Sequence, residues 1–384
     1  MGKSINHILR VLLILSVTLL TGGLFSTKEH KYRWVFVYYI SYDNDLSVYG
    51  SKILEELARG VINDETAVVT QTDFSDSGGM KRVSFYGTGG KMKRRETPLR
   101  SEDSADPKEL KKFFDWVQDN WKADNYCVFL LDHGGSLNNI CKDDRPFNVT
   151  KVLNKSSTGK WLSALDAGKI IADFNREVDG KVRLLFLQQC ARGSIQNLYS
   201  FADTSEYIMA SPLKVGVPNT YYAKMLQSAA DDPNITPFQI ARTILREDED
   251  YTLYSLIDCN ELKKLPEKLK PVLDAFSRAG TLKPPQDCLP LFEYEDEKFY
   301  DLKSYFQALS FANKTGEREL KVFFDWCDNK LISAKLINNS KNIPFDKSWR
   351  SGLSIYVPTS KKEFGRYDFL PLYQQTNLYF IKSF

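Results

Sequence analysis

Apolar stretches and amphipathic stretches alternate along the first half of the chain. Four stretches are apolar almost throughout, namely 32–41, 66–72, 125–131 and 181–189. Continuous apolar runs of this length are typical of strands that are buried on both faces. Helices are expected between them, at 47–59, 106–121 and 161–178. The alternation predicts an α/β fold, in which helices flank both faces of a mostly parallel sheet and the crossovers are right-handed.

The helix after residue 106 carries the clearest start signal. Asp106 is a suitable N-cap, Pro107 suits the first helical position and Glu109 suits the third. Apolar residues then recur on one helical face, at Leu110, Phe113, Phe114, Val117 and Trp121.

The pattern is weaker elsewhere. We expect a surface excursion at 73–100 with one short strand at 82–86, and a polar, basic loop at 138–160. Further expected elements are a strand at 206–210, helices at 236–246 and 311–326, and a strand at 352–357. Together these predict an α/β core over 31–260, with a helical C-terminal region, 261–384, packed on it.

Composition excludes several classes of protein. The 384 residues are 42% hydrophobic and 26% charged, which is ordinary for a globular protein and excludes a disordered chain, a fibre and a polytopic membrane protein. The net charge of +3 gives no electrostatic reason to expect a nucleic-acid partner.

The first 26 residues resemble a secretory signal. Lys3 and Arg10 precede an apolar run over 11–25, and small or polar residues follow it. The run is shorter than the ~20 residues that span a bilayer comfortably. We expect a removed signal peptide and an exported protein, with an uncleaved anchor as the alternative. Only this segment would then contact a membrane.

Cysteine and histidine usage limits the possible chemistry. The six cysteines include no C-x-x-C pair, which argues against a structural zinc site and a thioredoxin-like dithiol. One or two disulfides remain open in an exported protein. Of the three histidines, only His133 lies within the expected globular part, and no metal site is expected.

Two reactive side chains follow buried strands. His133 comes after the run 125–131, and Cys190 comes after the run 181–189. One crossover helix separates these strands, so a right-handed crossover brings both carboxyl ends to the same sheet edge. A thiolate there can attack a carbonyl, and an imidazole can protonate the leaving amine. The N–H groups of Gly134 and Cys190 are candidate oxyanion donors.

Simpler interpretations exist for each residue taken alone. A single cysteine at a strand end is usually a small core residue, and a single histidine is more often a surface or capping residue. The joint arrangement at two strand ends favours the catalytic interpretation.

These residues resemble a known family. Segments 38–46 (YYISYDNDL), 130–135 (LLDHGG) and 184–190 (LLFLQQC) are similar to the clostripain family of cysteine peptidases, within the caspase, legumain and gingipain clan. The similarity extends to 251–258 and 351–358. It implies a caspase-like sheet, His133 and Cys190 as a catalytic dyad, and Gly134 at the oxyanion. It also implies endopeptidase activity, often after Arg or Lys, and a zymogen cut between the dyad residues.

One position departs from the family pattern. Relatives usually carry an Asp two residues before the nucleophile, where this chain has Gln188. The segment 211–222, expected to line the S1 subsite, holds no acid and contains Lys214. We take Gln188, Ser211 and Pro212 as S1 candidates. A basic P1 side chain normally pairs with a carboxylate, so the P1 preference stays open.

Two further segments have alternative interpretations. The basic stretch between the dyad residues is either an activation loop or a solvated loop; it holds Lys142, Arg145, Lys151, Lys155 and Lys160. The acidic turn 43–45 is a helix-capping turn or, as in some relatives, a calcium site; no other cofactor is expected. Asp132 is a candidate for orienting the imidazole.

The sequence therefore predicts an exported cysteine endopeptidase that acts on proteins or peptides. We expect a monomer, in two chains after processing. A catalytically silent peptide-binding homologue is the alternative, motivated by Gln188. An exported thiol redox protein is disfavoured, because no second cysteine lies near Cys190 in the sequence.

Overall fold

The computed structural model describes residues 30–75, 79–101, 103–144, 160–248, 253–285, 288–337 and 351–381. Residues Tyr32–Phe384 form one compact unit, separate from Met1–Lys31. The expected signal peptide and most of the expected activation loop lie outside the described residues. Within the ranges given above, no helix combines the length and apolarity that crossing a membrane requires.

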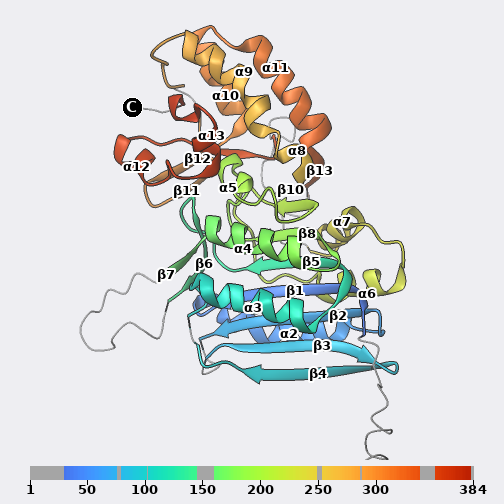
Figure 1. The fold of residues 1–384 in the computed structure, drawn as a ribbon. Coiled ribbons are helices and arrows are strands. Elements are labelled where there is room, and N and C mark those ends of the chain that lie inside the picture. The colour runs from blue at the N-terminus through green and yellow to red at the C-terminus, as the bar shows by residue number, and fades with distance from the viewer. Residues whose placement is uncertain are drawn as a thin grey trace, which may run out of the picture. The chain divides into compact units, whose positions relative to one another are not determined.

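A large sheet forms the centre of the unit (Figure 1). In the described part of the chain its nine strands run in the order β13-β10-β9-β8-β5-β1-β2-β3-β4. Their bounds are β1 Tyr32–Tyr42, β2 Thr66–Phe74, β3 Lys81–Thr88, β4 Lys91–Pro98, β5 Ala123–Leu131, β8 Lys181–Gln188, β9 Tyr207–Ala210, β10 Leu253–Asp258 and β13 Ile332–Ile337. The five central strands, β2 to β9, pair in parallel, and the outer pairings are antiparallel.

Helices cover both faces of this sheet. Helices α3 (Pro107–Asn120) and α4 (Ala164–Glu177) pack on one face, and α2 (Gly50–Gly60), α6 (Tyr222–Asp231) and α7 (Pro237–Glu247) pack on the other. Side chains of β1 alternate between the two cores, so both faces of the strand are buried away from water. This explains why the central runs are apolar throughout, and the predicted α/β architecture is confirmed.

Start signals in the sequence correspond to real caps. The Asp106 carboxylate accepts from Lys108 N–H at the start of α3. Thr236 and Gln239 form a reciprocal capping box at the start of α7. Each satisfies backbone donors that the first turn of a helix leaves unpaired.

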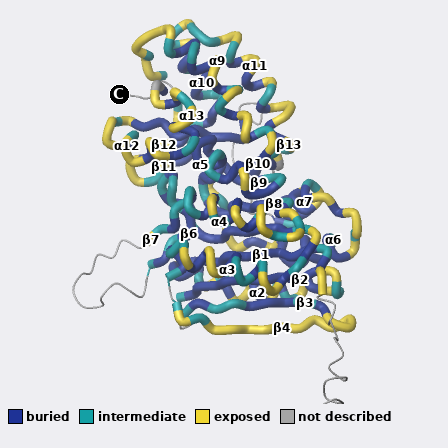
Figure 2. The backbone as a smooth tube through the Cα atoms, in the orientation of Figure 1, coloured by how far each residue is buried: buried dark blue, intermediate teal, exposed yellow. Residues whose placement is uncertain are grey.

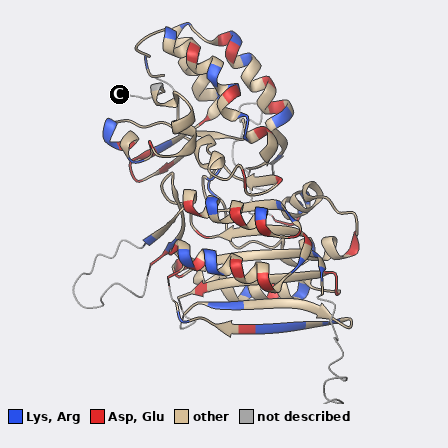
Figure 3. Cartoon of the chain, viewed as in Figure 1, with Lys and Arg blue, Asp and Glu red and all other residues tan. Residues whose placement is uncertain are grey.

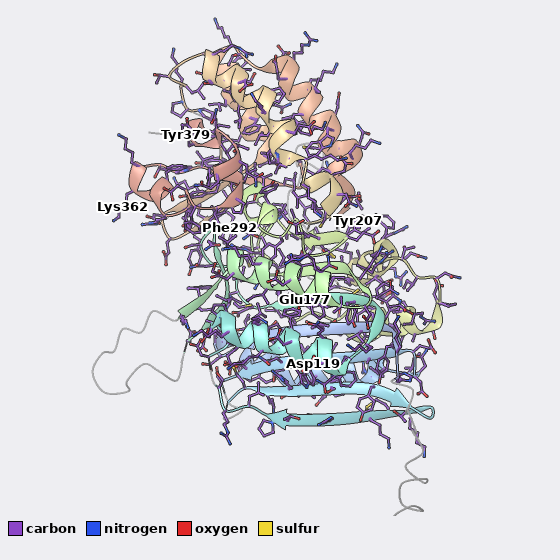
Figure 4. All side chains as sticks on the ribbon, in the orientation of Figure 1. Asp119, Glu177, Tyr207, Phe292, Lys362 and Tyr379 are labelled. Carbon is purple, nitrogen blue, oxygen red and sulfur yellow. The ribbon has the colours of Figure 1, made fainter. Side chains whose placement is uncertain are left out.

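The C-terminal part adds a helical layer and a small sheet. Its helices are α8 Cys259–Leu262, α9 Leu265–Arg278, α10 Leu302–Asn313, α11 Glu317–Trp326, α12 Lys361–Gly365 and α13 Pro371–Gln375. Strands β11 Phe292–Tyr294, β12 Glu297–Asp301 and β14 Ser354–Tyr356 form a three-stranded sheet. Phe292 from β11, labelled in Figure 4, packs on Phe299 with ring centroids 5.7 Å apart. Short turns η1 Asp45–Tyr49, η2 Cys327–Leu331 and η3 Leu378–Phe380 and helix α5 Ile195–Tyr199 complete the unit.

Three expectations about elements were wrong in detail. The single helix expected at 311–326 is two helices, because Lys314 and Gly316 adopt left-handed backbone with φ of 50° and 78°. The expected loop 138–160 contains strand β6 (Asn139–Asp143), and it ends at β7 (Lys160–Ser163). Helix α4 accordingly starts after its N-cap Ser163 rather than at residue 161.

The excursion at 73–100 is a hairpin of two long strands. Its second strand, β4, was missed because none of its residues is buried and charge replaces the apolar pattern (Figures 2 and 3). It forms the sheet edge, where Lys and Arg side chains discourage pairing with a further strand.

Candidate active site

Strands β5 and β8 lie side by side and end at the same edge of the sheet. Their last paired residues are Leu131 and Gln188, so continuing the parallel register brings His133 opposite Cys190. The two connections also touch through their backbones. A Cβ built on Gly134 would lie 2.0 Å from the Cys190 carbonyl oxygen and 3.0 Å from the Cys190 nitrogen. Only glycine allows this approach, which places the imidazole-bearing segment against the thiol-bearing one.

The thiol at this edge differs from most of the others in its exposure. All six cysteines are free thiols, so the disulfides left open by the sequence are not formed. Four are buried, and burial raises the pKa of each thiol, to about 12 for Cys259. Of the two partly exposed ones, Cys288 also has its pKa raised by burial, to about 11. Cys190 is partly exposed, and so is the imidazole of His133, the residue that the strand register places opposite it.

The partner of the imidazole is Asp45, the first residue of η1. His133 Nε2 lies 2.7 Å from Asp45 Oδ1. This hydrogen bond lowers the pKa of the Asp45 carboxyl. The Asp45 side chain is 81% exposed, so the interaction is screened by water.

Asp132, considered as the orienting residue, has a different role. It is buried, and its carboxylate accepts from the Asn44 amide at 2.8 Å and from the backbone N–H of Lys142. Burial raises its pKa well above the usual range. Asn44 also caps η1 by accepting from Leu46 N–H. Asp132 therefore holds the turn that presents Asp45, and it acts on the imidazole indirectly.

A buried arginine joins the two connections. Arg192 has no exposed surface, and its guanidinium donates to four backbone carbonyls: those of Cys190 (2.9 Å), Asn139 (2.7 Å), Ser136 (3.2 Å) and Gly135 (2.7 Å). Burial lowers its pKa to about 10, which still leaves it charged at neutral pH. The guanidinium thus connects the segment after His133 to the backbone of Cys190.

The C-terminal part supports the same segment from outside. The buried Glu297 carboxylate of β12 accepts from Leu137 N–H at 2.8 Å and from the Tyr367 hydroxyl. Burial raises the pKa of Glu297. From β14, Ser354 N–H donates to the Gly193 carbonyl at 2.9 Å. Both loops of the site are therefore anchored by residues far along the chain.

The S1 candidates fall in two places. Ser211 and Pro212 are buried against the cysteine loop, where Gly193 N–H donates to the Ser211 carbonyl at 2.8 Å. Gln188 is 5% exposed and binds Asn219 and Tyr222 through its amide nitrogen. Lys214 is exposed on the connecting segment.

The candidate oxyanion donors are open. Within the described ranges, neither Gly134 N–H nor Cys190 N–H donates to another residue. The described residues also hold no group of three His, Cys, Asp or Glu side chains arranged for a metal ion.

Sequence reasoning missed the roles of three residues. Asp45 lies in the motif segment 38–46, but no sequence pattern shows which acid meets the imidazole. Arg192 lies two residues after Cys190, and a fully buried guanidinium has no sequence signature. Glu297 carries no signal at all, because its role depends on how the C-terminal part packs.

Comparisons with known proteins agree with this fold. A model of the clostripain family matches residues 38–380. An inactive zymogen C11 protease from Parabacteroides distasonis has a TM-score of 0.70 at 17% identity, covering 90% of this chain and 98% of that one. A secreted C11 cysteine protease from Bacteroides thetaiotaomicron, bound to an irreversible peptide inhibitor, has a TM-score of 0.63 at 16% identity, covering 90% and 99%. No curated protein sequence matches the chain.

The caspase-like sheet and the family match together define a cysteine peptidase. The chain belongs to the clostripain family.

The exposed Asp45–His133 pair predicts a modest effect on activity. Replacing Asp45 by Asn should lower kcat/KM by about 2–5-fold, because exposed ion pairs contribute roughly 0.2–1 kcal/mol. The pKa of Asp45 is lowered, so its contribution is present above that pKa and is lost as the pH falls through it. Measuring kcat/KM against pH tests this, with Asp115→Asn on α3 as control. A loss above about 100-fold would show that the pair is not screened.

The buried guanidinium predicts a large effect on stability. Arg192→Met should lower the free energy of unfolding by about 3 kcal/mol or more, because each buried acceptor left unpaired costs about 1–3 kcal/mol. Arg192→Lys should lose less, since it keeps the charge but has fewer donors. Urea denaturation measures both. The exposed Arg242→Met on α7 should stay within about 0.5 kcal/mol of the wild type, and an equally small effect for Arg192→Met would contradict the clamp.

Proposed function

We propose that the protein is an exported cysteine endopeptidase that uses Cys190 and His133 as its catalytic dyad. The Cys190 sulfur attacks the carbonyl of the scissile peptide bond, and the thiol proton passes to His133. Gly134 N–H and Cys190 N–H donate to the oxyanion of the tetrahedral intermediate. His133 then protonates the leaving amine, and the imidazole activates the water that hydrolyses the thioester.

One observation carries this proposal: the backbone contact of Gly134 with Cys190 at the shared ends of β5 and β8. It supports a short distance between the imidazole and the thiol, because Gly134 directly follows His133. Asp45 binds Nε2, which leaves Nδ1 to face the sulfur. The unpaired N–H groups described above support the oxyanion assignment, because a substrate oxygen would be their first acceptor.

The same proposal assigns roles to the parts of the chain. Residues 31–260 form the catalytic core, and 261–384 add strand β13 to the edge of its sheet, pack on it and hold the site loops through Glu297 and Ser354. Residues 1–26 are the export signal, in keeping with the similarity of the chain to a secreted C11 protease from Bacteroides thetaiotaomicron.

Activation by self-cleavage between the dyad residues is also part of the proposal. Strands β6 and β7 pair through Asp143 and Lys160, so they hold both ends of the intervening segment. One structural relative is described as an inactive zymogen. A cut between these strands would leave both new ends held by the hairpin and by the pairing of Lys160 with Asp103 at 2.7 Å.

Removing either dyad residue should abolish peptide hydrolysis. We expect Cys190→Ala and His133→Ala each to lower kcat by at least about 1,000-fold, since dyad members act as a unit. Cys288→Ala, which removes the other partly exposed thiol, should keep wild-type activity. Turnover that survives in either dyad variant would move the chemistry elsewhere.

Iodoacetamide labelling separates an enzyme from a silent homologue. Carboxamidomethylation of Cys190, with loss of hydrolysis, is expected. A folded protein whose Cys190 is not labelled and which binds peptides without cutting them would favour the silent binding homologue.

Self-processing predicts two chains from the wild type and one from the inactive variant. Purified wild type should split near residues 140–160, whereas Cys190→Ala should stay whole. Intact mass spectrometry measures this, and gel filtration should find the two chains still associated through the β6–β7 pairing. Identical single chains from both proteins would remove self-activation from the account.

A further inference from the structure

A small, partly open hollow lies between two segments that also contact the proposed dyad residues. Tyr42, Tyr49 and Ile53 line it from the end of β1, η1 and α2. Val217, Pro218 and Asn219 line it from the segment between β9 and α6.

Both walls are tied to the dyad by hydrogen bonds. Asp45, which lies between the lining residues Tyr42 and Tyr49, binds the His133 imidazole through its carboxylate at 2.7 Å. Val215, two residues before the lining residue Val217, donates its backbone N–H to the Cys190 sulfur at 3.4 Å. The hollow therefore lies between one segment that reaches the imidazole and one that reaches the thiol.

We propose that this hollow is the S1 subsite and that it selects an uncharged P1 side chain. The proposal rests on the proposed peptidase function. It names uncharged residues, such as Leu, Met and Gln, as the P1 class.

Asn219, which lines the hollow, belongs to a network of neutral polar groups. Its side-chain oxygen accepts from the amide nitrogen of Gln188, two residues before the nucleophile. The same nitrogen donates to the Tyr222 hydroxyl at 3.1 Å, and the Tyr221 hydroxyl donates to Gln188 Oε1 at 2.6 Å. Burial raises the pKa of Tyr222, which keeps its hydroxyl neutral. The network offers no net charge to a basic P1 group.

The charged groups around the hollow do not supply a free carboxylate either. Glu56 lines the hollow but pairs with Arg59, and Lys52 of opposite sign lines it one turn earlier. Asp248 is fully buried, and its Oδ2 accepts from Thr220 N–H at 3.1 Å. A guanidinium entering this site would lose its hydration without gaining a free carboxylate to pair with. The tyrosine, isoleucine, valine and proline side chains of the walls instead suit an uncharged side chain.

A matched peptide set tests the proposal on the self-processed enzyme with both of its chains present. The peptides are identical except at P1, where they carry Leu, Met, Gln, Arg, Lys or Asp. We expect the best uncharged peptide to exceed the Arg and Lys peptides in kcat/KM by at least about 30-fold. Equal or faster cleavage after Arg or Lys would overturn the inference.

Changing the charge of the network gives a second readout. Gln188→Asp should shift the ratio of kcat/KM for Arg over Leu upward by at least about 10-fold, because it adds a carboxylate that a guanidinium can bind. Asn219→Asp should shift the ratio in the same direction if Gln188→Asp does not fold. Gln374→Asp on α13 adds the same charge outside the lining of the hollow and should leave the ratio unchanged. An unchanged ratio in both variants, if both fold, would show that Gln188 and Asn219 do not select the P1 side chain.

The two levels of the argument fail in different ways. Labelling of Cys190 by iodoacetamide together with a preference for Arg or Lys would leave the peptidase function standing and reject the uncharged S1 subsite. No labelling and no cleavage of any peptide would reject the peptidase function, and the inference with it.

Discussion

The parallel pairing of β5 with β8 is the constraint on which the site depends. Parallel neighbours end at one edge of the sheet, and their common register sets which residues of the two connections meet. Here it brings the segment after His133 onto the cysteine loop so closely that residue 134 has no room for a side chain. Since both strands are buried on both faces, a slip in register by one residue would turn each side chain into the opposite core and disrupt the packing of both. The stability of the core thus maintains the geometry of the edge.

Such an edge leaves many backbone groups out of the strand ladder, and they need partners. Arg192 supplies them for four carbonyls at once, and Glu297 supplies an acceptor for Leu137 N–H. A buried charge is expensive unless it is hydrogen-bonded, which the Arg192 geometry achieves. These bonds fix the backbone of both loops, while the side chains of His133 and Asp45 stay partly exposed to water.

An acid is expected two residues before the nucleophile in this family. Here Gln188 replaces it, and Gln188 belongs to a larger network of uncharged side chains. Gln188 is held by Asn219, Tyr221 and Tyr222, so its amide is a built element of the fold rather than an isolated change. A carboxylate at this position would face two hydroxyls and an amide in a buried setting.

The sequence by itself determined the central parallel strands and the start of α3, because burial on both faces and the start of a helix each leave a local pattern. It also singled out His133 and Cys190 as candidate reactive residues. It failed where the hydrophobic pattern of the sequence does not match the structure. Strand β4 has no buried residues, and the helix expected at 311–326 breaks at two left-handed positions. Only the tertiary structure decided that Asp45 rather than Asp132 meets the imidazole, that Arg192 is buried among carbonyls, and that Gln188 faces two tyrosines. These contacts join residues from separate elements. Their partners depend on strand order and register, which no short stretch of sequence encodes.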